Sequence, residues 1–73
     1  MKKSLRTKEH NAFVERLRKA REEAGLNQVQ VAKKLGCTQS YISKLESGEL
    51  KVDVVKLKRF AELYGKNINY FLK

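Results

Sequence analysis

Three short polar residues stand where helices are expected to begin, and they are the strongest constraint on how this chain can fold. Asn27, Thr38 and Asp53 are residue types whose side-chain oxygen accepts a hydrogen bond from a free backbone N–H at a helix start. Each is preceded by an apolar residue and followed four positions later by another, which is the spacing of a hydrophobic staple. The staple pairs are Leu26 with Val31, Cys37 with Ile42, and Val52 with Leu57. The chain is therefore expected to form several short helices with defined starts.

Glycines mark the expected ends of these helices. Gly25, Gly36, Gly48 and Gly65 separate the apolar segments, and the sequence contains no proline. The period-two alternation that is typical of strands is absent. We therefore predict an all-α fold, a compact five-helix domain with helices at about residues 8–24, 28–35, 39–47, 54–64 and 68–72.

Apolar residues at helical spacing predict which helix faces form the core. The stripes are Phe13, Leu17, Ala20 and Ala24 in the first helix, Leu57, Phe60, Ala61 and Tyr64 in the fourth, and Ile68, Phe71 and Leu72 in the last. Residues 1–6 carry three positive charges and no apolar pattern. We expect them to be a basic tail, either a frayed end or an arm that touches phosphates, and residues 7–73 to be the domain.

Size and composition exclude several classes of protein. The chain has 73 residues, and a domain of this size buries only about 60% of its unfolded surface, which makes a deep catalytic cavity hard to build. One cysteine, Cys37, and one histidine, His10, cannot supply an internal disulfide or a zinc site within one chain. Cys37 is instead expected to be a small buried apolar residue. No apolar run approaches the roughly 18 residues that span a bilayer. We expect a soluble cytoplasmic protein with no enzymatic activity, metal or cofactor.

The charge balance indicates the kind of partner. Seventeen lysines and arginines against eight acidic residues give a net charge of +9. The excess is spread along the chain and does not come from the tail alone. Such a charge favours a polyanion as partner, although it could also serve only to keep a small domain in solution.

Residues 28–46 predict two short helices that cross. The apolar positions Val31, Leu35, Ile42 and Leu45 lie on both sides of a break at residues 36–38. Close packing of such short helices needs a small residue at the crossing and a turn residue that can adopt positive φ, which Ala32 and Gly36 provide. This is the layout of a helix-turn-helix.

The stretch LRKAREEAGLNQVQVAKKLGCTQSYISKLESGE resembles the DNA-binding domain of the phage repressor and Cro-type (XRE-like) helix-turn-helix family. The resemblance covers about residues 11–72 and implies five helices, with the helix at 39–47 in the major groove of double-stranded DNA. The sequence departs from the family at Val54 and Val55, which are apolar where an exposed first turn is usually polar. An apolar patch at this position could serve dimer contact.

The polar face of the third helix is the expected reading surface. At 100° per residue, Ile42 and Leu45 point to one side of this helix and its polar residues to the other. The resemblance implies base contacts, and its expected residues are Gln39, Ser40, Ser43 and Lys44. Contacts to the DNA backbone are expected from Asn27, Gln28, Thr38 and Tyr41. Without the surrounding motif, the same polar face would be an ordinary helix exterior.

The resemblance also implies an ion pair that holds the reading helix. Arg21 and Glu46 border the apolar stripes of the first and third helices, and family members often pair an arginine and a glutamate at the matching positions. We expect a largely shielded pair, with two solvated surface charges as the alternative.

These observations predict a sequence-specific transcriptional regulator, most simply a repressor that binds a palindromic operator as a homodimer. Tyr70 and Phe71 are the candidate dimer contacts, unless both side chains belong to the core. The alternative function is that of an antitoxin, a protein-interaction module that neutralises a partner protein and binds DNA secondarily.

Overall fold

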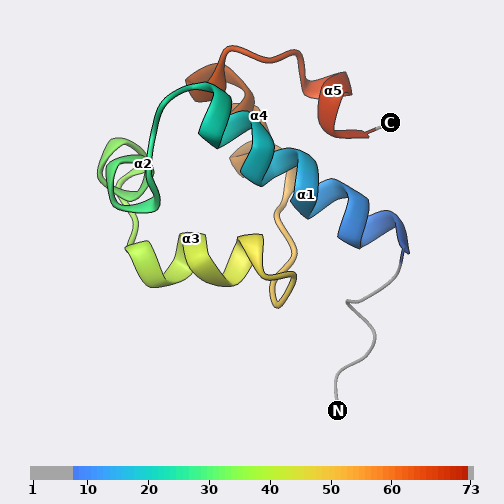
Figure 1. The fold of residues 1–73 in the computed structure, drawn as a ribbon, viewed down its shortest axis with the longest axis horizontal. Coiled ribbons are helices and arrows are strands. Elements are labelled where there is room, and N and C mark those ends of the chain that lie inside the picture. The colour runs from blue at the N-terminus through green and yellow to red at the C-terminus, as the bar shows by residue number, and fades with distance from the viewer. Residues whose placement is uncertain (1–7, 73) are drawn as a thin grey trace.

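The computed structural model describes residues 8–72, and within that range every regular element is a helix. The helices are α1 (Lys8–Glu23), α2 (Gln28–Leu35), α3 (Gln39–Glu46), α4 (Val54–Tyr64) and α5 (Ile68–Leu72), shown in Figure 1. Each bound lies within one residue of the expected one, and the all-α fold is confirmed. The expected basic tail, residues 1–6, lies outside the described residues.

Helix α1 is the element around which the others are arranged. It packs against α3, α4 and α5, whereas α2 packs mainly against α3. In Figure 1, α1 runs diagonally across the molecule, with α2 and α3 beside its C-terminal half and α5 on the opposite side. The two short helices of the expected helix-turn-helix therefore form one corner of the molecule.

The three expected N-caps are confirmed. The side-chain oxygens of Asn27, Thr38 and Asp53 accept hydrogen bonds from the backbone N–H three residues later, at 2.8, 3.1 and 2.7 Å. At α2 the cap is reciprocal, because the Asn27 N–H donates to Oε1 of Gln30 at 2.8 Å. Each cap satisfies a donor that would otherwise have no partner in the helix. The helix starts are thus fixed by contacts within a few residues.

The turn between α2 and α3 depends on Gly36. Its φ of 71° lies in the left-handed region, which a residue with a Cβ atom enters at a cost. Its N–H points to the last carbonyls of α2, and the Cys37 N–H donates to the Ala32 carbonyl at 2.9 Å. Cys37 itself is half-buried against the core. This turn sets the direction in which α3 leaves α2.

The core contains the expected apolar stripes with two corrections. Its largest fully buried side chains are Phe60, Phe71, Leu17, Ile42, Leu45 and Val31. Ala24 is exposed, because α1 ends at Glu23 and Ala24 lies in the following turn, and Val14 is buried on the same helix. Leu72 is 63% exposed, because it lies in the last turn of a five-residue helix on the side away from the core.

The candidate dimer contacts in α5 differ in burial. Phe71 is 1% exposed and packs edge-on against Phe13, with 6.4 Å between ring centroids, so its side chain belongs to the core and is not available for a dimer contact. Tyr70 is half-buried, and Nζ of Lys66 lies 4.7 Å from its ring centroid. Lys66 also pairs with Glu23 at 2.8 Å, which ties the α4–α5 turn to the end of α1.

A shielded ion pair joins α1 to α3. Nε of Arg21 donates to Oε2 of Glu46 at 2.7 Å and Nη2 donates to Oε1 at 3.0 Å, so the contact is bidentate. The side chains are 12% and 4% exposed. The hydrogen bonds to Glu46 raise the pKa of Arg21, which keeps the guanidinium charged. Nη1 of Arg21 also donates to the Leu26 carbonyl at 3.0 Å, so the pair holds the α1–α2 turn as well.

We predict that this pair contributes strongly to stability. Glu46→Gln removes one partner of a shielded pair and should lower the free energy of unfolding by about 3–5 kcal/mol. The apolar double variant Arg21→Met with Glu46→Leu should recover much of that loss, since neither charge is then left unpaired. Urea unfolding of both singles and the double measures these values. A matched control is Glu15→Gln, which breaks the exposed Arg18–Glu15 pair and should change stability by less than about 1 kcal/mol. Equal effects of Glu15→Gln and Glu46→Gln would contradict the prediction.

A second prediction concerns the turn. Gly36→Ala should lower the free energy of unfolding by about 1–2 kcal/mol, because alanine must adopt left-handed backbone angles. A Cβ at this position meets no atom within 4 Å, so the loss should come from the backbone alone. Gly36→Asn, which adds a larger side chain of a type that tolerates this region, should cost less than Gly36→Ala. A larger loss for asparagine, measured by the same urea curves, would indicate a steric origin.

Candidate nucleic-acid interface

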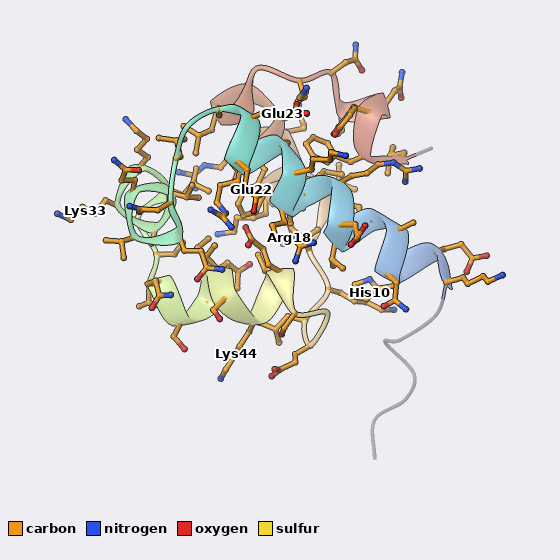
Figure 2. The ribbon with its side chains drawn as sticks, in the orientation of Figure 1. His10, Arg18, Glu22, Glu23, Lys33 and Lys44 are labelled. Atoms are coloured by element: carbon orange, nitrogen blue, oxygen red, sulfur yellow. The ribbon has the colours of Figure 1, made fainter. Side chains whose placement is uncertain are left out.

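The exposed face of α3 carries the residues expected to read bases. Gln39, Ser40 and Lys44 are exposed and Ser43 is half-buried, while Ile42 is only 1% exposed on the other side of the helix. In Figure 2, Lys44 points away from the body of the molecule. Because the serines are short, the backbone of α3 is open to close approach by a large flat or grooved partner.

A chain of hydrogen bonds connects this face to the buried ion pair. Oε1 of Glu46 accepts a hydrogen bond from Nε2 of Gln28 at 3.1 Å. Oε1 of Gln28 in turn accepts one from Nε2 of Gln39 at 2.7 Å. The order is therefore Arg21, Glu46, Gln28, Gln39, which runs from α1 through α3 and α2 and back to the first residue of α3. We call these four residues the Arg21–Gln39 chain.

The chemistry of the chain fixes the orientation of each amide. An ionised carboxylate can only accept hydrogen bonds, so the amide nitrogen of Gln28 must face Glu46. The oxygen of Gln28 then faces Gln39 and requires a donor there. Gln39 consequently uses one hydrogen of its Nε2 internally and keeps one donor and its Oε1 acceptor for an external group. Since Gln39 is exposed, this donor and acceptor are accessible to an external group.

The expected backbone-contact residues lie at the starts of α2 and α3. Asn27 and Thr38 are exposed caps whose oxygens accept a backbone N–H, which leaves their donor hydrogens free for an external acceptor such as a phosphate. Gln28 is half-buried and is committed to the Arg21–Gln39 chain. Besides the DNA backbone contact expected from the sequence, Gln28 therefore has a second role, which is to orient the side chain of Gln39.

Tyr41 occupies a different position from the other expected contacts. It is half-buried, and Nζ of Lys56 on α4 lies 5.4 Å from its ring centroid. Burial, followed by the charge of Asp53, raises the pKa of Tyr41, so its hydroxyl stays protonated and can donate. Its ring joins α3 to α4 at the edge of the exposed face.

The sequence interpretation missed the contacts of Gln28 with Glu46 and Gln39. The signal available was the pair of glutamines that open both helices of the helix-turn-helix, eleven residues apart. Nothing in that spacing shows that their side chains meet, because the contact depends on the crossing angle of α2 and α3. Positive charge near this surface includes Lys33 and Lys34 in the last turn of α2 and Lys44 in that of α3.

Within residues 8–72 the structure contains no group of three or more His, Cys, Asp or Glu side chains that could hold a metal ion. No helix in this range is both long enough and apolar enough to cross a membrane.

Comparison with known proteins shows the family to which this chain belongs. The chain is 42% identical to the glutamine–fructose-6-phosphate aminotransferase (isomerizing) of Methanocaldococcus jannaschii over 53 residues, which are 71% of this chain and 5% of that protein. The chain thus spans a small fraction of that protein, whose name describes the whole of it. A family model described as helix-turn-helix matches residues 17–71, which include α2, α3, α4 and the whole Arg21–Gln39 chain. The chain therefore belongs to the helix-turn-helix family of the phage repressor and Cro type, a family of DNA-binding transcription regulators.

Proposed function

We propose that this protein is a sequence-specific repressor that binds a palindromic operator as a homodimer, with α3 in the major groove. The observation that carries the proposal is the fixed orientation of the Gln39 amide on the exposed face of α3. A side chain held with one donor and one acceptor outward is suited to reading a base edge. Binding to polyanions in general, without sequence preference, would need only the positive charge of the surface.

Gln39 is proposed to read adenine. Adenine presents an acceptor, N7, beside a donor, the N6 amino group, and a glutamine can contact both. Guanine presents two acceptors, N7 and O6, and would require two donor hydrogens. One hydrogen of Gln39 Nε2 is engaged by Gln28, so only one remains. The Arg21–Gln39 chain therefore favours adenine over guanine at this position.

The remaining polar residues of the surface are proposed to share the contacts to DNA. Lys44 can donate to guanine O6 or N7, and Ser40 and Ser43 are short enough to let α3 approach the groove floor. Asn27, Thr38 and Tyr41 are proposed to donate to phosphates beside the N-termini of α2 and α3, where backbone N–H groups favour anions.

The homodimer is proposed to form through α4 and α5. With Phe71 in the core, Tyr70 remains as the aromatic candidate for the contact. Val55 on α4 is 71% exposed and is a second apolar residue available to it.

We predict that Gln39→Ala weakens binding to the best site by about 1–3 kcal/mol and relaxes the preference at one base pair. Gln28→Ala should act differently, because it frees the second hydrogen of Gln39 Nε2. The affinity of Gln28→Ala for the best site should fall less than that of Gln39→Ala, while its preference for adenine over guanine at the same base pair should shrink. Selection from random duplex DNA, followed by titration of single-base variants, measures both effects. Lys33→Gln is the control, since loss of a surface charge should weaken all sequences similarly. An unchanged selected motif in Gln39→Ala would show that α3 is placed wrongly.

We further predict that the selected sites are inverted repeats. Two copies of α3 related by a two-fold axis enter successive major grooves, so half-site centres should lie about 10 base pairs, or about 34 Å, apart. Insertion of about five base pairs between the half-sites places them on opposite faces of the duplex and should abolish the gain from the second half-site. An asymmetric site bound with equal affinity by one copy would contradict the homodimer.

A further inference from the structure

An open apolar groove lies apart from the DNA-reading surface. It has a volume of about 650 Å³ and is formed by the first turns of α1, the segment before α4, the start of α4 and the end of α5. Its lining includes the core side chains Leu57 and Phe71, and Phe13, which is half-buried and packs against the core. In Figure 2, His10, which lines the groove, lies at the opposite side of the molecule from Lys33 on α2. None of the residues assigned above to DNA contact lines it.

The walls of the groove leave apolar side chains in solvent. Val54 and Leu72 line it and are 67% and 63% exposed. Together with Val29 and Val55, they are the large apolar residues that the described part of the chain exposes. Two of these four thus line one groove. Exposed apolar residues gathered around a groove are typical of an interaction surface, whereas single ones are not.

The charged residues of the groove are mostly cationic. Lys8, Arg16 and Lys51 lie on its rim with one acidic residue, Glu9. None of the three cations forms an ion pair with another residue of the range 8–72. The rim therefore complements negative charge. The homodimer contact proposed above uses Tyr70 and Val55, and neither residue lines this groove.

The open shape of the groove also selects among occupants. Small-molecule sites usually enclose most of the ligand surface, which a groove with such exposed walls does not. An amphipathic helix needs only one apolar face covered, and its other face remains in water. We propose that this groove binds an acidic amphipathic helix of a partner protein, with its apolar face against Val54 and Leu72 and its carboxylates beside Lys8, Arg16 and Lys51.

The probe for this proposal is a synthetic peptide of about four helical turns with leucines along one face and glutamates on both sides of them. One control peptide has the same composition in shuffled order, which keeps the charge and removes the stripe. A second control has lysine in place of every glutamate. Backbone amide shifts of the labelled full chain locate the binding site, and fluorescence anisotropy gives the affinity.

The acidic amphipathic peptide should shift the amides of Val54, Leu57 and Leu72. Val54→Ser should weaken it about tenfold, whereas Val29→Ser, which alters another exposed valine outside the groove, should change affinity less than about twofold. Lys51→Glu should weaken the acidic peptide and strengthen the lysine peptide. All three substituted positions are exposed, so the variants should fold, and thermal unfolding checks this.

Several outcomes would overturn the proposal. Equal binding of the shuffled peptide, or shifts on α3 instead of the groove, would reduce the effect to net charge. Equal losses in Val54→Ser and Val29→Ser would place the contact elsewhere. Amide shifts at the groove that grow with protein concentration, in the absence of peptide, would show that a second copy is the occupant. Decanoate is a small amphiphile with one carboxylate. If it shifted the same amides more strongly than the peptide, the groove would bind small amphiphiles. None of these measurements uses DNA, so they stand or fail separately from the proposed operator binding.

Discussion

The bidentate contact between Arg21 and Glu46 is the interaction on which the rest of the structure depends. It lies where α1, α2 and α3 meet, and it joins the last turn of α1 to the last residue of α3. Its Arg21 also holds the Leu26 carbonyl, and its Glu46 orients Gln28. Two short helices that could not persist alone are thereby attached to the longest helix of the fold. The same contact that stabilises the domain also determines which atoms Gln39 presents.

Much of the fold could be predicted from the sequence because its signals are local. A cap such as Thr38 needs only the N–H three residues later, and Gly36 needs only its own backbone angles, so neither depends on distant parts of the chain. The crossing of α2 and α3 followed from the short break between their apolar positions. The position of Arg21 beside Glu46 came from the resemblance to the family, since nothing in the residues alone places these two groups in contact.

Other features could not be predicted because they depend on how helices are placed in space. The hydrogen bond from Gln39 to Gln28 needs the crossing angle of their helices, which side-chain spacing does not give. The exposure of Ala24 depends on where α1 stops, and a one-residue change at a helix end is within the uncertainty of any sequence pattern. The exposure of Leu72 and the burial of Phe71, two adjacent residues, depend on how α5 docks against Phe13.

The fixed amide of Gln39 has a consequence for how the residues of this surface can change during evolution. A new residue at position 39 that cannot donate leaves the oxygen of Gln28 without its partner, and a new residue at position 28 releases Gln39. Substitutions at the two positions are therefore coupled energetically. Changes at positions 28 and 39 should therefore occur together. Arg21 and Glu46 should remain constant, because the residue at position 28 is oriented by the Glu46 carboxylate. Proteins that diverge from this one should thus change residues 28 and 39 together, although the two residues lie on different helices.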